Sequence, residues 1–234
     1  MKYTTKCRIN EAKSVFDGVH KSFSNYNFVN GMSLLNNFIV NELSGIYIDI
    51  TKDSLYCDAK DDARRTSSQS AMALIVKSLL TLIAPILTYT ADEIVEYLPE
   101  VIRESKEDIF DFVHKNIDVA ESGFNTEYMY AAREKFYEIV DGLKKEKIIK
   151  NTLELVIVTE SKKIAEMDKT AAEDWFVVSG ISHTQIIEEL GKFEVDGDIF
   201  VIQKATDAKC PRCWKYQAKD ETSACKRCSK VLNA

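Results

Sequence analysis

The chain has 234 residues, of which 45% are hydrophobic and 29% charged, and its formal net charge is −6. This length can bury a substantial core in one or two domains, and the composition is ordinary for a soluble globular protein. The longest apolar region, 71–87, is interrupted by polar residues and by Pro85, so we expect no membrane-spanning segment and no membrane partner. The six cysteines come without a recognisable targeting segment, which favours a reducing cytoplasm.

The acidic net charge is unevenly distributed. Residues 201–234 contain eight Lys or Arg and three acidic residues, a formal +5, so the first 200 residues carry −11. Four thiolates around one divalent ion would bring this tail nearer to +3. A local basic patch attracts an anionic partner whatever the net charge of the whole chain. The alternative is a tail whose charge only improves solubility.

Apolar residues at helical spacing predict that the first half of the chain is helical. A first helix is expected at Asn10–Asn25, and a long one at Asn27–Asp53, where apolar residues recur every three or four positions. The polar stretch Leu55–Arg65 is interpreted as a connector. Ser67–Ala84 is apolar on most sides, so we expect it at the centre of a helical bundle.

Proline and capping signals divide the next part of the chain. Pro85 is expected to end the preceding helix. Thr90 and Glu93 fit a capping box that would open a short helix, which Pro99 would close. A further amphipathic helix is expected at Asn125–Lys147.

The pattern changes to β-structure near residue 150. Leu153–Thr159 and Trp175–Ser179 are runs rich in β-branched or aromatic residues and predict strands. Phe193–Gln203 predicts a hairpin that turns at Asp196 and Gly197, because Asp-Gly favours a two-residue turn. We therefore expect a mainly α fold in three parts. These are a helical bundle over 1–147, a small α/β unit over 148–205 and a four-cysteine zinc knuckle, or zinc finger, over 206–234.

The tail contains two Cys-x-x-Cys pairs in the spacing C-x2-C-x11-C-x2-C. The four ligand candidates are Cys210, Cys213, Cys225 and Cys228. Two such knuckles can place four thiolates at the corners of a tetrahedron, which is the geometry of a structural zinc site. Four protein ligands leave no open position for a catalytic water, so one Zn²⁺ here would be structural.

Three other readings of the four cysteines are open. Disulfides are disfavoured because no signal peptide is present and because Cys7 and Cys57 are left over as free thiols. A redox motif should lie in a βαβ context rather than in a polar tail. An iron–sulfur centre also accepts four thiolates.

Four stretches together resemble one known family. Residues 26–58, with Tyr26-Asn-Phe and Leu35-Asn-Asn-Phe, closely resemble the anticodon-binding helical domain of bacterial isoleucyl-tRNA synthetases. Residues 82–94, with Ala-Pro-Ile-Leu-Thr-Tyr-Thr-Ala-Asp-Glu, look like the later signature of that bundle. Residues 147–154 and the Cys-Pro-Arg-Cys-Trp tail are similar to the C-terminal region and zinc finger of these enzymes. The bundle alone is shared with valyl-, leucyl- and methionyl-tRNA synthetases, and the tail points to the isoleucine enzymes.

The resemblance implies a class I anticodon-binding bundle whose partner is the tRNA that accepts isoleucine. The family activates its amino acid with His-x-Gly-His and Lys-Met-Ser-Lys-Ser motifs, and neither is in this chain. No catalytic residue is therefore expected here, and ATP would bind only in the catalytic domain of the parent enzyme. That domain and the editing domain would precede this chain.

Five tail residues are candidates for contacts with RNA. Trp214 could stack on a base, but covering the zinc sulfurs or docking the knuckle is the favoured role, because Trp buries most of its surface in proteins. Lys215, Lys226 and Arg227 are phosphate candidates, against the alternative of a solvated face. Arg212 lies close to Trp214 in the sequence and belongs to the same set.

A second basic element lies at Arg64 and Arg65. The resemblance implies a paired basic element at this place, before a helix. Contact with RNA competes with a simpler explanation, since Asp61 and Asp62 are adjacent and could form ion pairs with the arginines.

The function expected from these observations is the C-terminal, tRNA-recognition part of an isoleucine–tRNA ligase, in a cytoplasmic and monomeric parent enzyme. One alternative is a free-standing zinc-containing RNA-binding module derived from a synthetase. Another is an oxidoreductase that uses the Cys-x-x-Cys pairs, which would have redox-active thiols and little zinc.

Overall fold

The structure is a computed structural model that describes residues 3–112, 125–183 and 187–233, with side chains from residue 9 onward. Contacts divide the chain into two units. The first comprises Met1–Ile48 and Lys60–Phe124, and the second comprises Asp49–Ala59 and Asn125–Ala234. The expected mainly α fold with small sheets is confirmed. The three-part division with boundaries after residues 147 and 205 stays a prediction.

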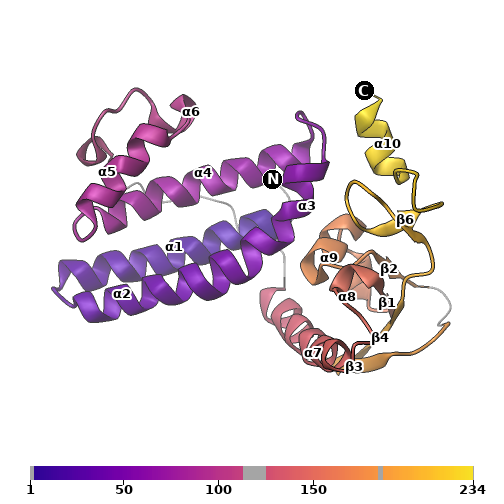
Figure 1. Cartoon of the computed structure of the whole chain (residues 1–234). Coiled ribbons are helices and arrows are strands. Elements are labelled where there is room, and N and C mark those ends of the chain that lie inside the picture. The colour runs from indigo at the N-terminus through magenta and orange to yellow at the C-terminus, as the bar shows by residue number, and fades with distance from the viewer. Residues whose placement is uncertain (1–2, 113–124, 184–186, 234) are drawn as a thin grey trace. The chain divides into compact units, whose positions relative to one another are not determined.

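The first unit is helical (Figure 1). Its elements are α1 (Tyr3–Ser24), α2 (Phe28–Asn37), the π-helix η1 (Phe38–Ile48), α4 (Ala63–Ile83), α5 (Thr88–Tyr97), α6 (Glu100–Arg103) and the 3-10 turn η2 (Ile109–Asp111). Helix α1 packs against both α2 and α4. Phe16 of α1 meets Phe38 edge to face, with 5.3 Å between the ring centroids. A smaller apolar cluster joins the end of α4 to α5 and η2.

Helix α4 is long and apolar enough by composition to cross a membrane. It packs against α1 and buries Ala71, Ile75 and Leu82. This is the behaviour of the central bundle helix that the sequence predicts.

The second unit is built on a four-stranded sheet of order β2-β1-β4-β3. The strands are β1 (Leu155–Thr159), β2 (Gly180–Ser182), β3 (Gly191–Val195) and β4 (Asp198–Lys204). β1 is parallel to β2 and antiparallel to β4, and β3 and β4 form the predicted hairpin at Asp196-Gly197. Both turn residues have positive φ, as a type I′ turn requires.

The second unit also contains helices, two of which pack on the sheet. The helices are α3 (Asp49–Cys57), α7 (Thr126–Lys145), α8 (Lys162–Ala165), α9 (Lys169–Phe176) and α10 (Lys226–Leu232), with the 3-10 turn η3 at Thr152–Glu154. Helix α7 packs on β3, and α9 packs on β2, α3 and α7. The buried indole of Trp175 donates to the carbonyl of Met129, 2.9 Å away, and so joins α9 to α7.

The predicted strand at Trp175–Ser179 is wrong. Trp175 and Phe176 end helix α9, and the strand begins only at Gly180. Asp168 caps the helix by accepting from the backbone N–H of Ala171. The burial of residues 171, 172, 175 and 176 follows the helical period, which outweighs their β propensity.

Three predicted helix boundaries are also wrong. Helix α1 begins at Tyr3 rather than at Asn10. The predicted capping box at Thr90 and Glu93 does not form, because α5 already begins at Thr88 and its N-cap, Leu87, makes no side-chain hydrogen bond. The predicted connector at Leu55–Arg65 is shorter, since α3 runs to Cys57 and Asp62 caps α4.

The long helix predicted at Asn27–Asp53 is helical throughout but not uniform. Residues 38–48 are π-helical, between the α-helical turns of α2 and α3. Helix α4 ends at Ile83, directly before Ala84 and Pro85, as predicted.

Two glycines provide a test of the packing of the first unit. A Cβ at Gly31 of α2 would overlap the ring of Phe23 of α1, whereas a Cβ at Gly142 of α7 would meet nothing within 4 Å. We expect Gly31→Ala to lower the thermal unfolding midpoint, because overpacking costs about 1–3 kcal/mol and exceeds the helix-propensity gain of up to about 1 kcal/mol. Gly142→Ala, the matched control, should raise the midpoint. Equal increases in both variants would contradict this packing.

Candidate metal centre and the pocket beside it

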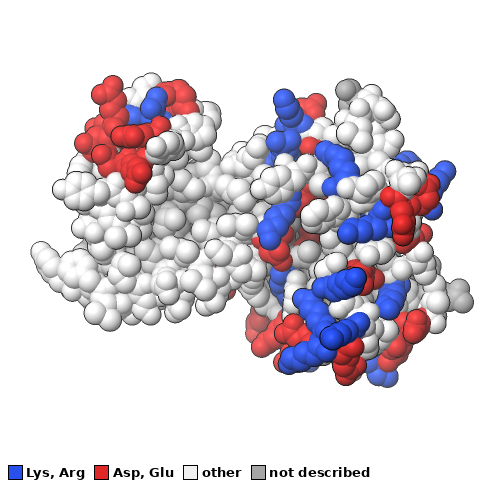
Figure 2. Space-filling model, viewed as in Figure 1, with Lys and Arg blue, Asp and Glu red and all other residues white. Residues whose placement is uncertain are grey.

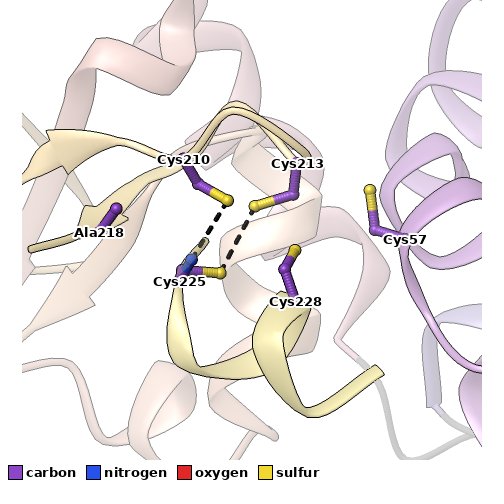
Figure 3. Close-up of a cluster of buried hydrophobic side chains, with 6 residues drawn as sticks. All are labelled: Cys57, Cys210, Cys213, Ala218, Cys225 and Cys228. Atoms are coloured by element: carbon purple, nitrogen blue, oxygen red, sulfur yellow. Dashed lines mark hydrogen bonds between the residues drawn. The ribbon is translucent and has the colours of Figure 1, made fainter. Parts of the chain in front are cut away.

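The four tail cysteines converge in the folded chain (Figure 3). Cys210 and Cys213 lie on the turn between β5 (Ala208–Lys209) and β6 (Tyr216–Ala218). Cys225 is the N-cap of α10, and Cys228 lies in its first turn. All four are buried, and their Sγ atoms lie within 4.8 Å of one another.

The spacing of the sulfurs fits a tetrahedral metal site. Metal–sulfur bonds of about 2.3 Å in a tetrahedron place neighbouring sulfurs about 3.8 Å apart. The Sγ atoms of Cys213 and Cys225 are 3.7 Å apart. None of the four cysteines forms a disulfide, and the cluster can therefore hold a metal ion. Cys57 is a free thiol, as predicted, and the side chain of Cys7 lies outside the described residues.

Hydrogen-bond donors stabilise the thiolate of Cys210, whereas burial raises the pKa of Cys213 and Cys225. The backbone N–H of Cys225 donates to Sγ of Cys210, at 3.3 Å. Burial alone would raise the pKa of Cys210, but backbone N–H groups of Cys213, Cys225 and Arg212 lower this pKa to about 6. Arg212 donates from Nη1 to Sγ of Cys228, at 3.4 Å. Cationic and N–H donors of this kind are the usual second layer of a thiolate metal site.

Arginine contacts connect the knuckle to helix α3. The guanidinium of Arg227 donates to both carboxylate oxygens of Asp53, with 2.6 Å between Nη2 and Oδ1, and lies 3.6 Å from Asp58. Nη1 of Arg212 donates to the carbonyl oxygen of Cys57, at 2.6 Å. Three contacts therefore reach α3 and the residue that follows it.

A buried ion pair connects the knuckle to helix α9. Lys215 is 3% exposed, and its Nζ lies 3.4 Å from Glu173 and 3.2 Å from Asp174. Burial would lower the pKa of Lys215, but the carboxylates of Asp174, Asp53 and Glu173 outweigh burial and raise it. Lys215 is therefore charged at neutral pH.

Trp214 differs from its neighbours in both backbone and exposure. Its φ is +65°, in the left-handed region that costs a non-glycine residue about 1–2 kcal/mol. The residue is 61% exposed, and the packing role favoured from the sequence stays a prediction. Nζ of Lys209 lies 5.4 Å from the centroid of the indole ring.

A pocket of about 420 Å³ lies between the knuckle and α3. One wall consists of residues 212–215, and α3 supplies the opposite wall with Ile50, Asp53, Tyr56 and Cys57. Leu153, Asp174 and Val177 also line it, together with Asp49 and Lys52. The lining surface is mostly apolar with charged groups among it, as is usual for ligand pockets.

The structure brings some of the predicted RNA contacts together. Arg212, Trp214 and Lys215 line the pocket, Arg227 is paired with α3, and Lys226 is exposed at the start of α10. In Figure 2, basic side chains over this second unit are interleaved with acidic ones, whereas acidic side chains gather over α5 and α6 of the first unit.

The predicted basic pair lies in the first unit. Arg64 and Arg65 occupy the first turn of α4, where Asp62 accepts from the backbone N–H of Arg64 at 2.7 Å. Arg64 is 9% exposed.

The contribution of α3 was missed by the sequence analysis. Lys52 and Tyr56 line the pocket, and Tyr56 is 79% exposed. The only sequence signal for this wall was the aromatic Tyr56, which lies in the segment Leu55–Arg65 that the sequence analysis interpreted as a polar connector. No local pattern connects residues near 50 with residues near 210.

Comparisons with known proteins show what this chain is similar to. Residues 8–159 match the family model described as the anticodon-binding domain of tRNA ligase. An isoleucine–tRNA ligase of Sulfurimonas denitrificans is 95% identical over 226 residues, which are 97% of this chain and 25% of that protein. Isoleucine–tRNA ligases of Nitratiruptor sp. and Aliarcobacter butzleri are 59% and 50% identical, over 95% and 96% of this chain and 24% of each ligase. The chain thus spans about a quarter of the length of these relatives.

Removing the metal tests the cysteine cluster. We expect mass spectrometry to find one metal ion per chain. A strong chelator should make residues 209–230 sensitive to protease, because the tail has little other core, while the strands of the four-stranded sheet stay protected. Cys228→Ala should lose the metal. Cys57→Ala, which removes a buried thiol outside the cluster, should keep it. A tail equally protected with and without the metal would contradict this account.

Proposed function

This chain belongs to the family of anticodon-binding domains of tRNA ligases, and from that premise we propose that it is the C-terminal, tRNA-recognition part of an isoleucine–tRNA ligase. The identity to three isoleucine–tRNA ligases, over nearly the whole chain in each case, supports the amino-acid specificity. The partner is the tRNA that accepts isoleucine.

The parent enzyme would charge this tRNA with isoleucine at the expense of ATP. The chain itself lacks the His-x-Gly-His and Lys-Met-Ser-Lys-Ser motifs, so the ATP site and the editing site would lie in the part of the parent that these residues do not cover. We propose a monomeric, cytoplasmic parent. The fragment alone would bind tRNA and catalyse no ligation.

Zinc is the metal proposed for the cluster. Four thiolates form a soft and closed donor set, and the 3.7 Å spacing between two of the sulfurs suits a tetrahedral Zn²⁺. Cys210, Cys213, Cys225 and Cys228 would hold it. The ion would supply no chemistry beyond holding the knuckle folded, since no coordination position is left for a substrate.

The observation that carries the RNA-binding role is the backbone conformation and the exposure of Trp214. Its backbone is in a conformation that glycine would adopt at lower cost, and its side chain is mostly exposed beside an apolar pocket. Neither backbone preference nor burial accounts for a tryptophan here. Stacking on a base does, because bases of an RNA loop can leave their stack and lie on an aromatic face.

The cations around Trp214 differ in what they are free to contact. Lys209 and Lys226 are exposed, so they are the strongest candidates for phosphate. Lys215 and Arg227 hold carboxylates of α9 and α3, and RNA would have to compete with those carboxylates. We therefore assign Lys215 and Arg227 first to holding the knuckle. Arg212, Arg64 and Arg65 remain proposed RNA contacts.

Loss of the indole tests the stacking role. We expect Trp214→Ala to weaken binding of isoleucine tRNA by about tenfold to a hundredfold, because stacking on an aromatic side chain contributes about 1–3 kcal/mol per base. The measurement is a titration of zinc-loaded chain with tRNA. Tyr97→Ala removes a similarly exposed aromatic, 78% exposed, from the first unit and should leave affinity unchanged. Equal affinities for the two variants would argue against stacking at Trp214.

Salt dependence tests the phosphate contacts. Each phosphate contact in a single-stranded region contributes about 0.7 to the slope of log affinity against log salt. Lys226→Ala should therefore reduce the slope by roughly that amount, whereas Lys192→Ala, which removes an exposed cation of β3, should not change it. If Lys226→Ala has the wild-type slope, this lysine does not contact phosphate.

A further inference from the structure

One nitrogen atom of Arg212 connects the metal cluster to helix α3. Its Nη1 donates to Sγ of Cys228, at 3.4 Å, and to the carbonyl oxygen of Cys57, at 2.6 Å. Cys228 is a candidate metal ligand on α10, and Cys57 is the last residue of α3. Nη1 carries two hydrogens, so both contacts can be made at once.

Both acceptors favour a cation. Four thiolates around one divalent ion have a net charge of −2, so a metal-bound sulfur stays a good acceptor for a guanidinium. The last carbonyl groups of a helix have no partner within the helix and carry the negative end of its dipole. Arg212 satisfies a sulfur and a helix end together. When the metal is removed, nothing holds the four sulfurs in one place, and the sulfur end of this link weakens.

The link also sets the distance between two walls of the pocket. Arg212, Cys213 and Trp214 belong to one wall, and Tyr56 and Cys57 belong to the opposite one. Arg212 donates a hydrogen bond to the carbonyl of Cys57 in the opposite wall. Trp214, whose indole is exposed, follows Arg212 by two positions in the chain. A change at the sulfur end of the link can therefore reach residues of both walls.

We propose that Arg212 is a positioning residue that couples metal occupancy of the cysteine cluster to the shape of the pocket. With the metal bound, Arg212 holds the end of α3 against the knuckle and fixes the place of Trp214. Without it, the Arg212 contact to the end of α3 weakens, and the wall is held less firmly by the remaining contacts of Arg227 with Asp53 and Asp58. This coupling goes beyond the proposed function and does not depend on which ligand enters the pocket.

Tryptophan fluorescence gives a direct readout. The chain has two tryptophans; Trp175 is fully buried and Trp214 is 61% exposed, so acrylamide quenching reports mainly on Trp214. In the wild type, we expect the quenching constant to change on chelation and to return when zinc is restored. Zinc affinity is measured in parallel by competition with a chromogenic chelator.

Three variants separate coupling from folding. Arg212→Met keeps the four metal ligands but should bind zinc about 10- to 100-fold more weakly, because it loses a hydrogen-bond partner of a metal ligand. At saturating zinc, the acrylamide quenching constant of Trp214 in this variant should stay near the value of the chelated wild type. Arg212→Lys should restore part of both properties. Lys219→Met, which removes an exposed cation of the same tail, should match the wild type. Wild-type zinc affinity together with wild-type quenching in Arg212→Met would overturn the proposal.

A second measurement needs no variant. Hydrogen exchange of the wild-type chain should show faster exchange over residues 49–57 when zinc is removed, although α3 contributes no metal ligand. Unchanged exchange in α3 while the knuckle loses its protection would also overturn the proposal. This test remains valid even if Arg212→Met does not fold.

Discussion

The knuckle of the second unit depends on four sulfur atoms being held together. The cluster at the centre of the tail contains, besides cysteines, only Ala218 among its buried members, so in the described residues it has almost no hydrocarbon core (Figure 3). A segment this short cannot offset the entropy of ordering its backbone by burying so little apolar surface. Metal–thiolate bonds can, since bound zinc contributes on the order of 10 kcal/mol or more to the folding of small knuckles. Trp214, with its positive φ, directly follows Cys213 and so belongs to the segment that this constraint holds folded.

The knuckle must also be oriented, and charged contacts do this. Lys215 with Asp174 and Arg227 with Asp53 are largely buried pairs, and removing one partner of such a pair typically costs about 3–5 kcal/mol because a charge is left without a partner. Such pairs add little net stability but fix one docking geometry. As a result two of the cations expected to face RNA are better explained as contacts to α9 and α3. The exposed cations and the exposed indole then remain for a ligand.

Local patterns predicted much of the fold and the metal centre. The cysteine spacing identified all four members of the cluster, and Asp196-Gly197 identified the hairpin, because both signals lie within a few residues of the structure they specify. Trp175–Phe176 was assigned to a strand, since aromatic residues favour strands unless a cap and a helical burial period outweigh them. The pocket could not be predicted, because its walls come from residues near 50 and near 212 that only the tertiary fold brings together. For the same reason the sequence could not show that Lys215 is buried while Trp214 is exposed.

The proposed function places a contact with tRNA at Trp214, beside the pocket between the knuckle and α3. The most direct measurement is hydrogen exchange of the zinc-loaded chain with and without isoleucine tRNA, followed by peptide mass analysis. The account predicts slower exchange in residues 49–57 and 209–216 on binding, with β3 and β4 unchanged. Binding that slows exchange elsewhere and leaves both of these segments unchanged would contradict it.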